Sequence, residues 1–325
     1  MASEHTSANP LLSVVIPMHN EHEMIPLLLP LLKEHLAPLG SYEIICVDDG
    51  SRDTTLALLQ AAAAANSHVR YLSFSRNFGH QSALKAGIDH ARGQAVITMD
   101  ADLQHPPELL ATMVQHWRKG GVEVVQMVRQ EADEPPFKRL TSRFFYTLIN
   151  RIGHCQIARG ASDFRLLDRK VVDVLASLPE RDLFLRGVIP WLGFSQLNLP
   201  YLPSARAAGK TKYSLARMLN LAISGITSVS IRPLRLSCFI GLVMAGVALL
   251  YACYALVAHL FLDTVVPGWT SLLAGIMLIG GIQMLMLGLI GEYIGKILVE
   301  VKNRPSYIVR EQSAGTLLRE VSAGY

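Results

Sequence analysis

Short apolar runs alternate with longer amphipathic segments over the first 130 residues of the chain. The apolar runs predict buried strands, and they span residues 12–17, 42–47, 69–75, 95–99 and 122–128. The segments between them have helical spacing, and they span residues 23–37, 53–66, 79–92 and 106–119. Strands that alternate with helices at this pitch predict βαβ units and therefore an α/β fold with a doubly wound, mostly parallel sheet.

The pattern becomes more mixed after residue 129. The elements expected there are a charged loop at 129–136, an amphipathic basic helix at 137–152, a strand at 164–167 and a helix at 169–178. A polar, basic loop at 205–212 then leads into the apolar stretch 213–231, which carries few charges. Such a stretch predicts one or two interfacial helices that lie along a membrane.

Two long runs without any Asp, Glu, Lys or Arg follow, at 236–262 and 269–291. They account for a composition that is 50% hydrophobic and only 17% charged. Uncharged apolar runs of about 20 residues are typical of transmembrane helices. The alternative is a buried core hairpin, which the length of the runs disfavours.

The charges around these runs predict their orientation. Arg232 and Arg235 precede the first run, and Lys296, Lys302 and Arg304 follow the second, whereas the loop between them carries only an acid. By the positive-inside rule, both ends of the hairpin and the N-terminal domain face the cytoplasm. The polar N-terminus lacks the apolar core of a signal peptide.

The predicted organisation therefore has four parts: an α/β domain at 1–212, interfacial helices at 213–234, two transmembrane helices within 235–295 and a basic helix with a tail at 296–325. The expected location is the inner (plasma) membrane, crossed more than once. None of the four cysteines (Cys46, Cys155, Cys238 and Cys253) belongs to a C-x-x-C pair, so we expect reduced packing residues without a disulfide or zinc site.

Polar side chains follow the predicted strand at 95–99. Asp100, Asp102 and Gln104 occupy alternate positions there, just before a helix that starts with two prolines. Carboxylates at the carboxyl end of a parallel strand face the crevice where open α/β sheets bind ligands. Such a cluster suits a hard divalent cation that also contacts substrate phosphates. Taken alone, a D-x-D pair is as compatible with an acidic surface turn.

More acids follow the first two predicted strands, namely Glu21, Asp48 and Asp49. The chain has neither G-x-G-x-x-G after its first strand nor G-x-x-x-x-G-K-[ST], so the usual phosphate-binding loops are absent. So many carboxylates at one edge are costly unless a cation and hydrogen-bond donors share the site. The set predicts a metal-assisted nucleotide site, although Asp48-Asp49-Gly50 alone would also suit a turn.

Together, these motifs resemble the GT-A-fold, inverting family 2 glycosyltransferases. More narrowly, they resemble the polyprenyl-phosphate glycosyltransferases, which include bactoprenol-phosphate glucosyltransferases and dolichyl-phosphate mannose synthases. The resemblance covers nearly the whole chain, including the two apolar runs. The segments that carry it lie at 15–21, 47–53, 76–80, 100–108, 162–169, 209–214 and 291–295.

The resemblance implies a role for particular residues. The nucleotide-sugar ligands it implies are Pro17, His19, Glu21, Asp48, Arg76, Ala101, Arg206 and Lys212. His19 replaces the tyrosine that is usual in this motif, and its imidazole ring can also stack on a base. The implied metal ligands for Mg²⁺ or Mn²⁺ are Asp100, Asp102 and Gln104, and the catalytic set is Asp100, Asp102, Arg143 and Arg165.

The implied reaction is the inverting transfer of a sugar, with UDP-glucose as the favoured donor, to polyprenyl (undecaprenyl) phosphate. An ionised phosphate needs no strong general base, and His80, His105 and His154 are expected to be surface or packing residues. Arg139, Arg143 and Arg165 are the candidate ligands of the acceptor phosphate. The basic loop that contains Arg206 and Lys212 either stabilises the leaving diphosphate or binds lipid headgroups.

Several alternatives remain open. The donor sugar could be aminoarabinose, mannose or an N-acetylhexosamine, and a non-catalytic protein that only binds lipid phosphate is a weaker alternative. A processive polysaccharide synthase is disfavoured, because the order Gln115-His116-Trp117-Arg118 differs from Q-x-x-R-W and two spans are too few for a pore. The expected partners are the lipid bilayer, a downstream flippase and a transferase that uses the lipid-linked sugar. A homo-oligomer is compatible with this, and no nucleic acid is expected.

Overall fold

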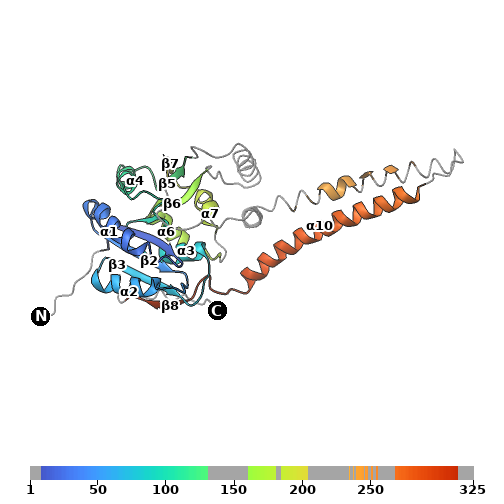
Figure 1. Ribbon diagram of the computed structural model, residues 1–325. Coiled ribbons are helices and arrows are strands. Elements are labelled where there is room, and N and C mark those ends of the chain that lie inside the picture. Colours follow the sequence, from blue (N-terminus) through green and yellow to red (C-terminus); the bar gives the residue numbers. More distant parts are fainter. Residues whose placement is uncertain are drawn as a thin grey trace.

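The computed structural model of the protein describes residues 9–130, 160–180, 184–203 and 268–313, together with short stretches between 234 and 254. An eight-stranded sheet forms the centre of the N-terminal domain (Figure 1). Its order is β7-β5-β6-β4-β1-β2-β3-β8. The strands are β1 (Leu12–Met18), β2 (Tyr42–Asp48), β3 (Val69–Phe74), β4 (Ala95–Thr98), β5 (Val124–Arg129), β6 (Ala161–Asp168), β7 (Gln196–Tyr201) and β8 (Val309–Gln312).

The middle of the sheet is parallel, as predicted. β1 pairs with β2 on one side and with β4 on the other, so that Leu12 lies opposite both Tyr42 and Ala95. All seven residues of β1 are buried, which is typical of a parallel strand that is covered on both faces. β6 is antiparallel to both β4 and β5, and β8 is antiparallel to β3.

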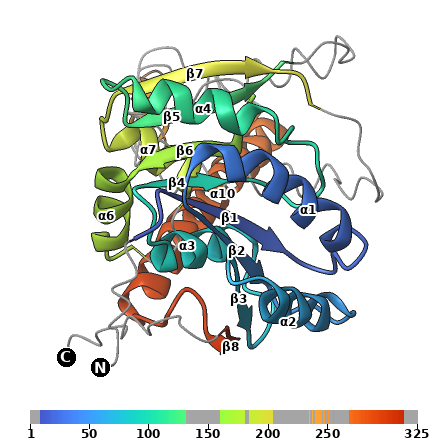
Figure 2. The ribbon, with the colours of Figure 1, turned by 90° about the vertical axis from the view of Figure 1, so that its left-hand side faces the viewer.

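Helices cover both faces of the sheet (Figure 2). One face packs against α1 (Ile25–Leu36), α2 (Thr55–Ala65) and α4 (Leu109–Arg118). The other face packs against α3 (His80–His90), α6 (Arg169–Ser177) and α7 (Leu185–Trp191). A short 3₁₀ turn, η1 (Ala37–Leu39), follows α1. This arrangement confirms the doubly wound fold and leaves the carboxyl edge of the parallel strands to the connecting loops.

Three described elements were not predicted from the sequence pattern: α7, β7 and β8. The strand expected at 164–167 is also longer, since β6 runs from Ala161 to Asp168. The helix expected at 106–119 is shorter, because α4 begins only at Leu109. The amphipathic helix at 137–152 and the interfacial helices at 213–231 lie outside the described residues.

The helix α10 (Trp269–Val301) projects from the domain. Its amino-terminal end lies far from the sheet, and its carboxyl-terminal end lies next to the domain (Figure 1). It joins the predicted second span and the basic segment after it into one 33-residue helix. Within the described part of the chain, one segment, Leu278–Val301, is long and apolar enough to cross a membrane, with a mean hydropathy of 1.5. Of the predicted first span at 236–262, the structure describes a helical stretch at 239–244 and a few further residues.

The chain returns to the domain after α10. Tyr307 stacks on Phe74 with ring centroids 5.2 Å apart, and its hydroxyl donates a hydrogen bond of 3.3 Å to Asp89. β8 then pairs with the edge strand β3, and the Tyr71 hydroxyl donates to Glu311 at 2.6 Å. A strand that follows the long apolar helix therefore completes the sheet.

Candidate active site

The loops after β1 and β2 are hydrogen-bonded to each other at the carboxyl edge of the sheet. The backbone N–H of Asn20 donates to the Ser51 hydroxyl at 2.9 Å, and the N–H of Arg52 donates to the Asn20 side chain at 2.9 Å. Asn20 has a φ of +56°, a left-handed conformation that asparagine tolerates better than most residues. Through these bonds the two loops form one continuous wall at the carboxyl edge of the sheet.

Four of the predicted nucleotide ligands lie on this wall. Pro17 is buried within β1, and Glu21 is partly buried where its backbone N–H donates to the Thr55 hydroxyl at 2.9 Å. His19 Nδ1 lies 2.9 Å from the carbonyl oxygen of Asp49. Asp48 is fully buried, and its carboxylate accepts hydrogen bonds from the Ser73 hydroxyl at 2.8 Å and the Ser51 N–H at 3.0 Å. Asp48 therefore supports the loop, and its contact with a nucleotide stays a prediction.

Asp49 connects this wall to the segment after β3. Its carboxylate accepts hydrogen bonds from the backbone N–H groups of Phe78 at 2.6 Å and Gly79 at 3.0 Å. Burial raises the pKa of Asp49, although these two N–H groups counteract the rise. Arg76 lies in the same segment, and its guanidinium carbon is 4.1 Å from the centroid of the Phe78 ring.

Asp100 and Asp102 lie in a tight turn after β4. The backbone N–H of Asp100 donates to His105 Nδ1 at 2.9 Å, and the N–H of Gln104 donates to the Asp102 carboxylate at 3.2 Å. Between them, Leu103 has a φ of +56°, which is uncommon for a residue with a bulky side chain. Strained conformations of this kind occur mainly at functional sites.

The chemistry of this turn fits a divalent cation. Oδ1 of Asp100 is buried and accepts no hydrogen bond from any residue that the structure describes, although Nε2 of His80 lies 3.5 Å from it as an ion-pair partner. An acceptor in this position is stabilised by a cation. In the described ranges, no group of three or more His, Cys, Asp or Glu side chains could hold a metal ion. Asp100, Asp102 and Gln104 would therefore share the ion with substrate phosphates or water, as Mg²⁺ sites commonly do.

A second carboxylate, Asp163, lies at the start of β6 beside this turn. Its side chain is 1% exposed. Arg186 donates to it through Nη2 at 2.8 Å and Nε at 3.1 Å, and Arg165 donates through Nη2 at 2.6 Å. His80 Nε2 lies 3.4 Å from Asp163 and thus between the two acids. The His80 side chain is 45% exposed, as expected of a surface histidine, and it also contacts both acids.

The charges of this cluster determine its protonation. Burial alone would raise the pKa of Asp163, but the charge of Arg186, the hydrogen bond from His80 and the charge of Arg165 hold it well below the usual range. Burial would lower the pKa of His80, but Asp163 and Asp100 outweigh it and raise the pKa. Burial lowers the pKa of His105, whose ring stacks on Phe164 as the expected packing histidine.

The remaining predicted residues fall into two groups. Arg143, Arg206 and Lys212 lie outside the described residues, as do Arg139 and His154. Arg165 is described, but its side chain is only 3% exposed, and it donates to Asp163 and to the carbonyl oxygen of Ser162 at 3.1 Å. Ala101 is buried next to Asp100. Cys46 is buried, as expected of a packing residue, and burial raises the pKa of its thiol to about 12.

Sequence reasoning missed Arg186 and assigned no role to Asp163. The motif around residues 162–169 drew attention to Asp163, but no spacing pattern indicated that an arginine 23 residues later contacts it. The only available signal was the charge of Arg186 itself. The segment after Arg186 is apolar and contains glycine and proline, so it gives no clear helical pattern.

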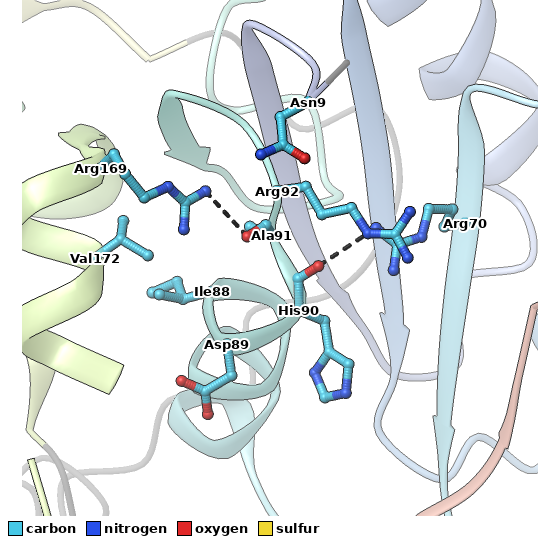
Figure 3. A pocket seen from close by; sticks show the side chains of 9 residues that line it. All are labelled: Asn9, Arg70, Ile88, Asp89, His90, Ala91, Arg92, Arg169 and Val172. Atoms are coloured by element: carbon cyan, nitrogen blue, oxygen red, sulfur yellow. Dashed lines mark hydrogen bonds between the residues drawn. The ribbon is translucent and has the colours of Figure 1, made fainter. Parts of the chain in front are cut away.

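A separate pocket of about 280 Å³ lies at the opposite, amino edge of the sheet (Figure 3). Arg70, Arg92 and Arg169 line it. Arg70 pairs with the buried Glu43, and Arg169 Nε donates to the carbonyl oxygen of Gly93 at 2.8 Å. These bonds stabilise the starts of the strands, whereas open α/β sheets bind substrates at the carboxyl edge. We therefore assign the active site to the edge that holds Asp100.

Comparisons with known proteins identify the family of the chain. Residues 13–175 match the family model of glycosyl transferase family 2, and residues 232–297 match that of the GtrB C-terminal hairpin. An uncharacterized glycosyltransferase of Bacillus subtilis is 42% identical, over 92% of this chain and 93% of its own length. A prophage-derived bactoprenol glucosyl transferase of Shigella flexneri is 40% identical, over 94% of this chain and 99% of its own length.

The fold also has a solved counterpart. A mannosyltransferase from Pyrobaculum calidifontis, determined in complex with GDP-Man and Mn²⁺, superposes with a TM-score of 0.50. The alignment covers 92% of this chain and 89% of the other, at 18% identity. The sequence matches, the mostly parallel sheet and the acidic carboxyl edge lead to the same conclusion: the chain belongs to glycosyl transferase family 2.

Proposed function

We propose that the protein transfers glucose from UDP-glucose to polyprenyl phosphate, with inversion at the anomeric carbon, at the cytoplasmic face of the membrane. The relatives named bactoprenol glucosyl transferase support the acceptor class and the sugar. The observation that carries the proposal is the buried Oδ1 of Asp100, which accepts no hydrogen bond from the described residues and lies beside Asp102 at the carboxyl edge, where a cation would stabilise it.

Different residues at the carboxyl edge would bind different parts of the donor. The wall with Pro17, His19 and Glu21 would receive the base and ribose. Asp100, Asp102 and Gln104 would hold Mg²⁺ or Mn²⁺, which supplies electrostatic stabilisation of the leaving diphosphate when it is bound. Arg206 and Lys212 would add positive charge near that diphosphate. Each of these roles is part of the proposal.

The acceptor would be a phosphate monoester, which is largely ionised at neutral pH, since the second pKa of protein-linked phosphates is about 6. Such a group can attack without a strong general base. Asp163 is surrounded by Arg165, Arg186 and His80, so its role is to organise positive charge. Attack from the face opposite the leaving diphosphate would invert the anomeric centre.

The apolar C-terminal part would place the site at the membrane surface, where the phosphate of the acceptor lies. Leu278–Val301 is long and apolar enough to cross a bilayer, and the end of α10 lies beside the sheet. A polyprenyl phosphate keeps its tail in lipid and its phosphate at the interface. Two spans and the interfacial segment at 213–234 would hold the carboxyl edge at that height, which restricts the search for the acceptor to a plane.

The test uses membranes that contain the full-length protein, supplied with polyprenyl phosphate and one labelled nucleotide sugar at a time. We expect a labelled lipid product with UDP-glucose and Mg²⁺ or Mn²⁺, and none after chelation. Asp102→Asn should abolish the product, whereas Asp173→Asn, at an acid that is 60% exposed on α6, should leave it unchanged.

The other outcomes are equally informative. A lipid product formed only from another nucleotide sugar would replace glucose with mannose, aminoarabinose or an N-acetylhexosamine. Full activity of Asp102→Asn in the presence of a chelator would contradict the proposed metal site. A protein that binds lipid phosphate but gives no product with any donor would be a scaffold.

A further inference from the structure

We propose that His105 is a positioning residue of the acidic turn after β4, because its imidazole ring holds both the backbone and the carboxylate of Asp100 in place. The role belongs to the ring nitrogen Nδ1 and goes beyond the packing of the ring. This inference rests on the proposed function, because it takes Asp100 and Asp102 to hold a divalent cation.

The first argument is the point at which the chain leaves the sheet. β4 pairs with β1 as far as Thr98, and the N–H of Met99 still donates to the carbonyl oxygen of Val15 at 3.1 Å. The next N–H along the chain, that of Asp100, donates instead to Nδ1 of His105 at 2.9 Å. His105 thus supplies the acceptor where the strand pairing ends, and its hydrogen bond closes the turn that carries both acids.

The second argument is the fixed position of the ring. His105 is 4% exposed. Its ring stacks on Phe164 of β6 with centroids 4.9 Å apart, and it meets the ring of Tyr201 of β7 edge-on at 6.0 Å. Pro106 follows, and a residue before proline is restricted to extended backbone conformations. Nδ1 is therefore an acceptor in a fixed place, which can determine the position of Asp100.

The third argument is the strain within the turn. Leu103 has a φ of +56°, and a strained conformation of this kind persists only where the surrounding structure holds it. Two contacts do so here, since the Leu103 side chain packs against the hydrophobic core and the hydrogen bond from Asp100 to His105 closes the turn. Without the acceptor on His105, the turn is free to relax, and the relative positions of Asp100 and Asp102 change.

The fourth argument concerns the carboxylate of Asp100. Because Nδ1 of His105 accepts a hydrogen bond, the proton of the ring lies on Nε2. Nε2 lies 3.6 Å from Oδ2 of Asp100, so the polar edge of the ring faces this oxygen. The other oxygen, Oδ1, is the one that is buried and accepts no hydrogen bond from the described residues. The ring therefore favours the orientation of Asp100 in which Oδ1 is left for a cation.

The experiment measures Mn²⁺ binding to the full-length protein in detergent, with UDP present, from the electron paramagnetic resonance signal of free Mn²⁺. His105→Phe keeps an aromatic ring and removes the acceptor. We expect its dissociation constant for Mn²⁺ to rise about ten- to hundredfold, the range for loss of a residue that orients a metal ligand. His105→Asn loses the ring but has an amide oxygen at the position of Nδ1, so its dissociation constant should stay within about threefold of the wild-type value.

His68→Phe is the matched control. His68 also stacks on an aromatic ring, with its centroid 4.5 Å from that of Tyr42, and its Nδ1 lies 2.9 Å from the carbonyl oxygen of Tyr42. Tyr42 is the first residue of β2, so this pair lies at the amino edge of the sheet. The Mn²⁺ affinity of this variant should equal that of the wild type. Thermal unfolding without metal shows which variants are folded.

Three results would overturn the inference. An unchanged Mn²⁺ affinity of a folded His105→Phe variant would mean that the ring only packs. A loss of affinity in His105→Asn as large as that in His105→Phe would mean that packing, and not the acceptor, determines the turn. If His105→Phe does not fold, His105→Asn decides alone, and a loss of more than about threefold contradicts the inference.

Failure of the proposed function would look different. In all three cases above, the wild type still binds Mn²⁺ in the presence of UDP and still transfers sugar to polyprenyl phosphate. A wild type that binds no Mn²⁺ under these conditions would contradict the proposed metal site itself, whatever the variants do.

Discussion

Single residues determine the shape of the donor wall, and Gly50 is the clearest case. It has a φ of +64°, a left-handed conformation in which a side chain is strained. A Cβ atom at this position would also lie 2.5 Å from the backbone carbon of Arg76. The loop after β2 can therefore approach the segment after β3 only because residue 50 has no side chain. This close approach brings Asp49 to the N–H groups of Phe78 and Gly79.

Gly50→Ala should accordingly combine two penalties. The left-handed conformation alone costs about 1–2 kcal/mol for a residue with a Cβ atom, and the contact with Arg76 forces the two loops apart. We expect a loss of unfolding free energy larger than that strain, together with a higher KM for the nucleotide sugar. Denaturant unfolding and donor kinetics measure the two effects.

Gly121→Ala separates the two penalties. Gly121 has a φ of +78°, but a Cβ atom at this position would meet no atom of the described residues within 4 Å. This variant should show the conformational strain alone and an unchanged KM. Equal destabilisation of both variants would mean that the close approach to Arg76 is unimportant.

At this scale, the sequence predicted the acids but not their partners. Asp48, Asp49, Asp100 and Asp102 follow strands that the apolar pattern identifies, so the topology of a parallel sheet brings them to one edge. The pairing of Asp163 with Arg186 depends instead on how α7 packs, which no local pattern encodes. The direction of the Arg165 side chain could not be predicted from the sequence either, because it depends on the pairing of β6 with β4.

Among the elements, β8 has an unusual role, since it protects an edge of the sheet. It covers β3, whose backbone groups would otherwise offer a template for another strand. Side chains reinforce the pairing, because Glu311 accepts hydrogen bonds from Tyr71 at 2.6 Å and Gln60 at 2.5 Å. β3 also carries Ser73, which donates to Asp48, so β8 supports the strand behind the donor wall.

Shortening the chain tests this role. A protein that ends at residue 304 keeps α10 but lacks Tyr307 and β8, and we expect it to aggregate and to lose donor binding because the edge of β3 is open. A protein that ends at residue 313 keeps β8 and should retain the activity of the full chain. Size-exclusion chromatography in detergent and the KM for the nucleotide sugar distinguish the two. Equal behaviour of both proteins would show that β8 is dispensable.

The elements that escaped prediction share a physical cause. β8 is four residues long with the sequence Val-Arg-Glu-Gln, which is too short and polar for a period of two to show. α7 contains Gly187 and Pro190, both of which oppose helix formation. Their structure comes from contacts with the rest of the sheet, whereas β1, β2 and β4 are apolar enough to be recognised on their own.

On the scale of the whole molecule, the two edges of the sheet have different surroundings. The carboxyl edge holds the acids and lies on the side where α10 joins the domain (Figure 1). The amino edge holds the arginine-lined pocket, whose bonds connect strand starts to each other (Figure 3). If α10 spans the membrane as proposed, the carboxyl edge faces the lipid surface and the amino edge faces the aqueous phase.

The proposed orientation predicts which positions are accessible from each side of the membrane. In a variant without the native cysteines, Thr264→Cys should react with an impermeant maleimide on intact spheroplasts, because the loop between the spans is expected outside. Lys302→Cys, after α10, should react only once the membrane is permeabilised. Labelling of both positions from the outside would contradict a hairpin with cytoplasmic ends.

The pairing of β3 with β8 also has a consequence for biosynthesis. Tyr71 and its partner Glu311 are 240 residues apart, and the apolar segment that would be inserted into the membrane is translated between them. At about 5–20 residues per second, the ribosome needs roughly 10–50 s to reach the partner strand after the domain begins to emerge. During that interval, the nascent domain exposes the edge of β3. If that segment enters the bilayer as proposed, completion of the sheet is tied to its delivery, and a chain that stalls before insertion would remain a substrate for chaperones.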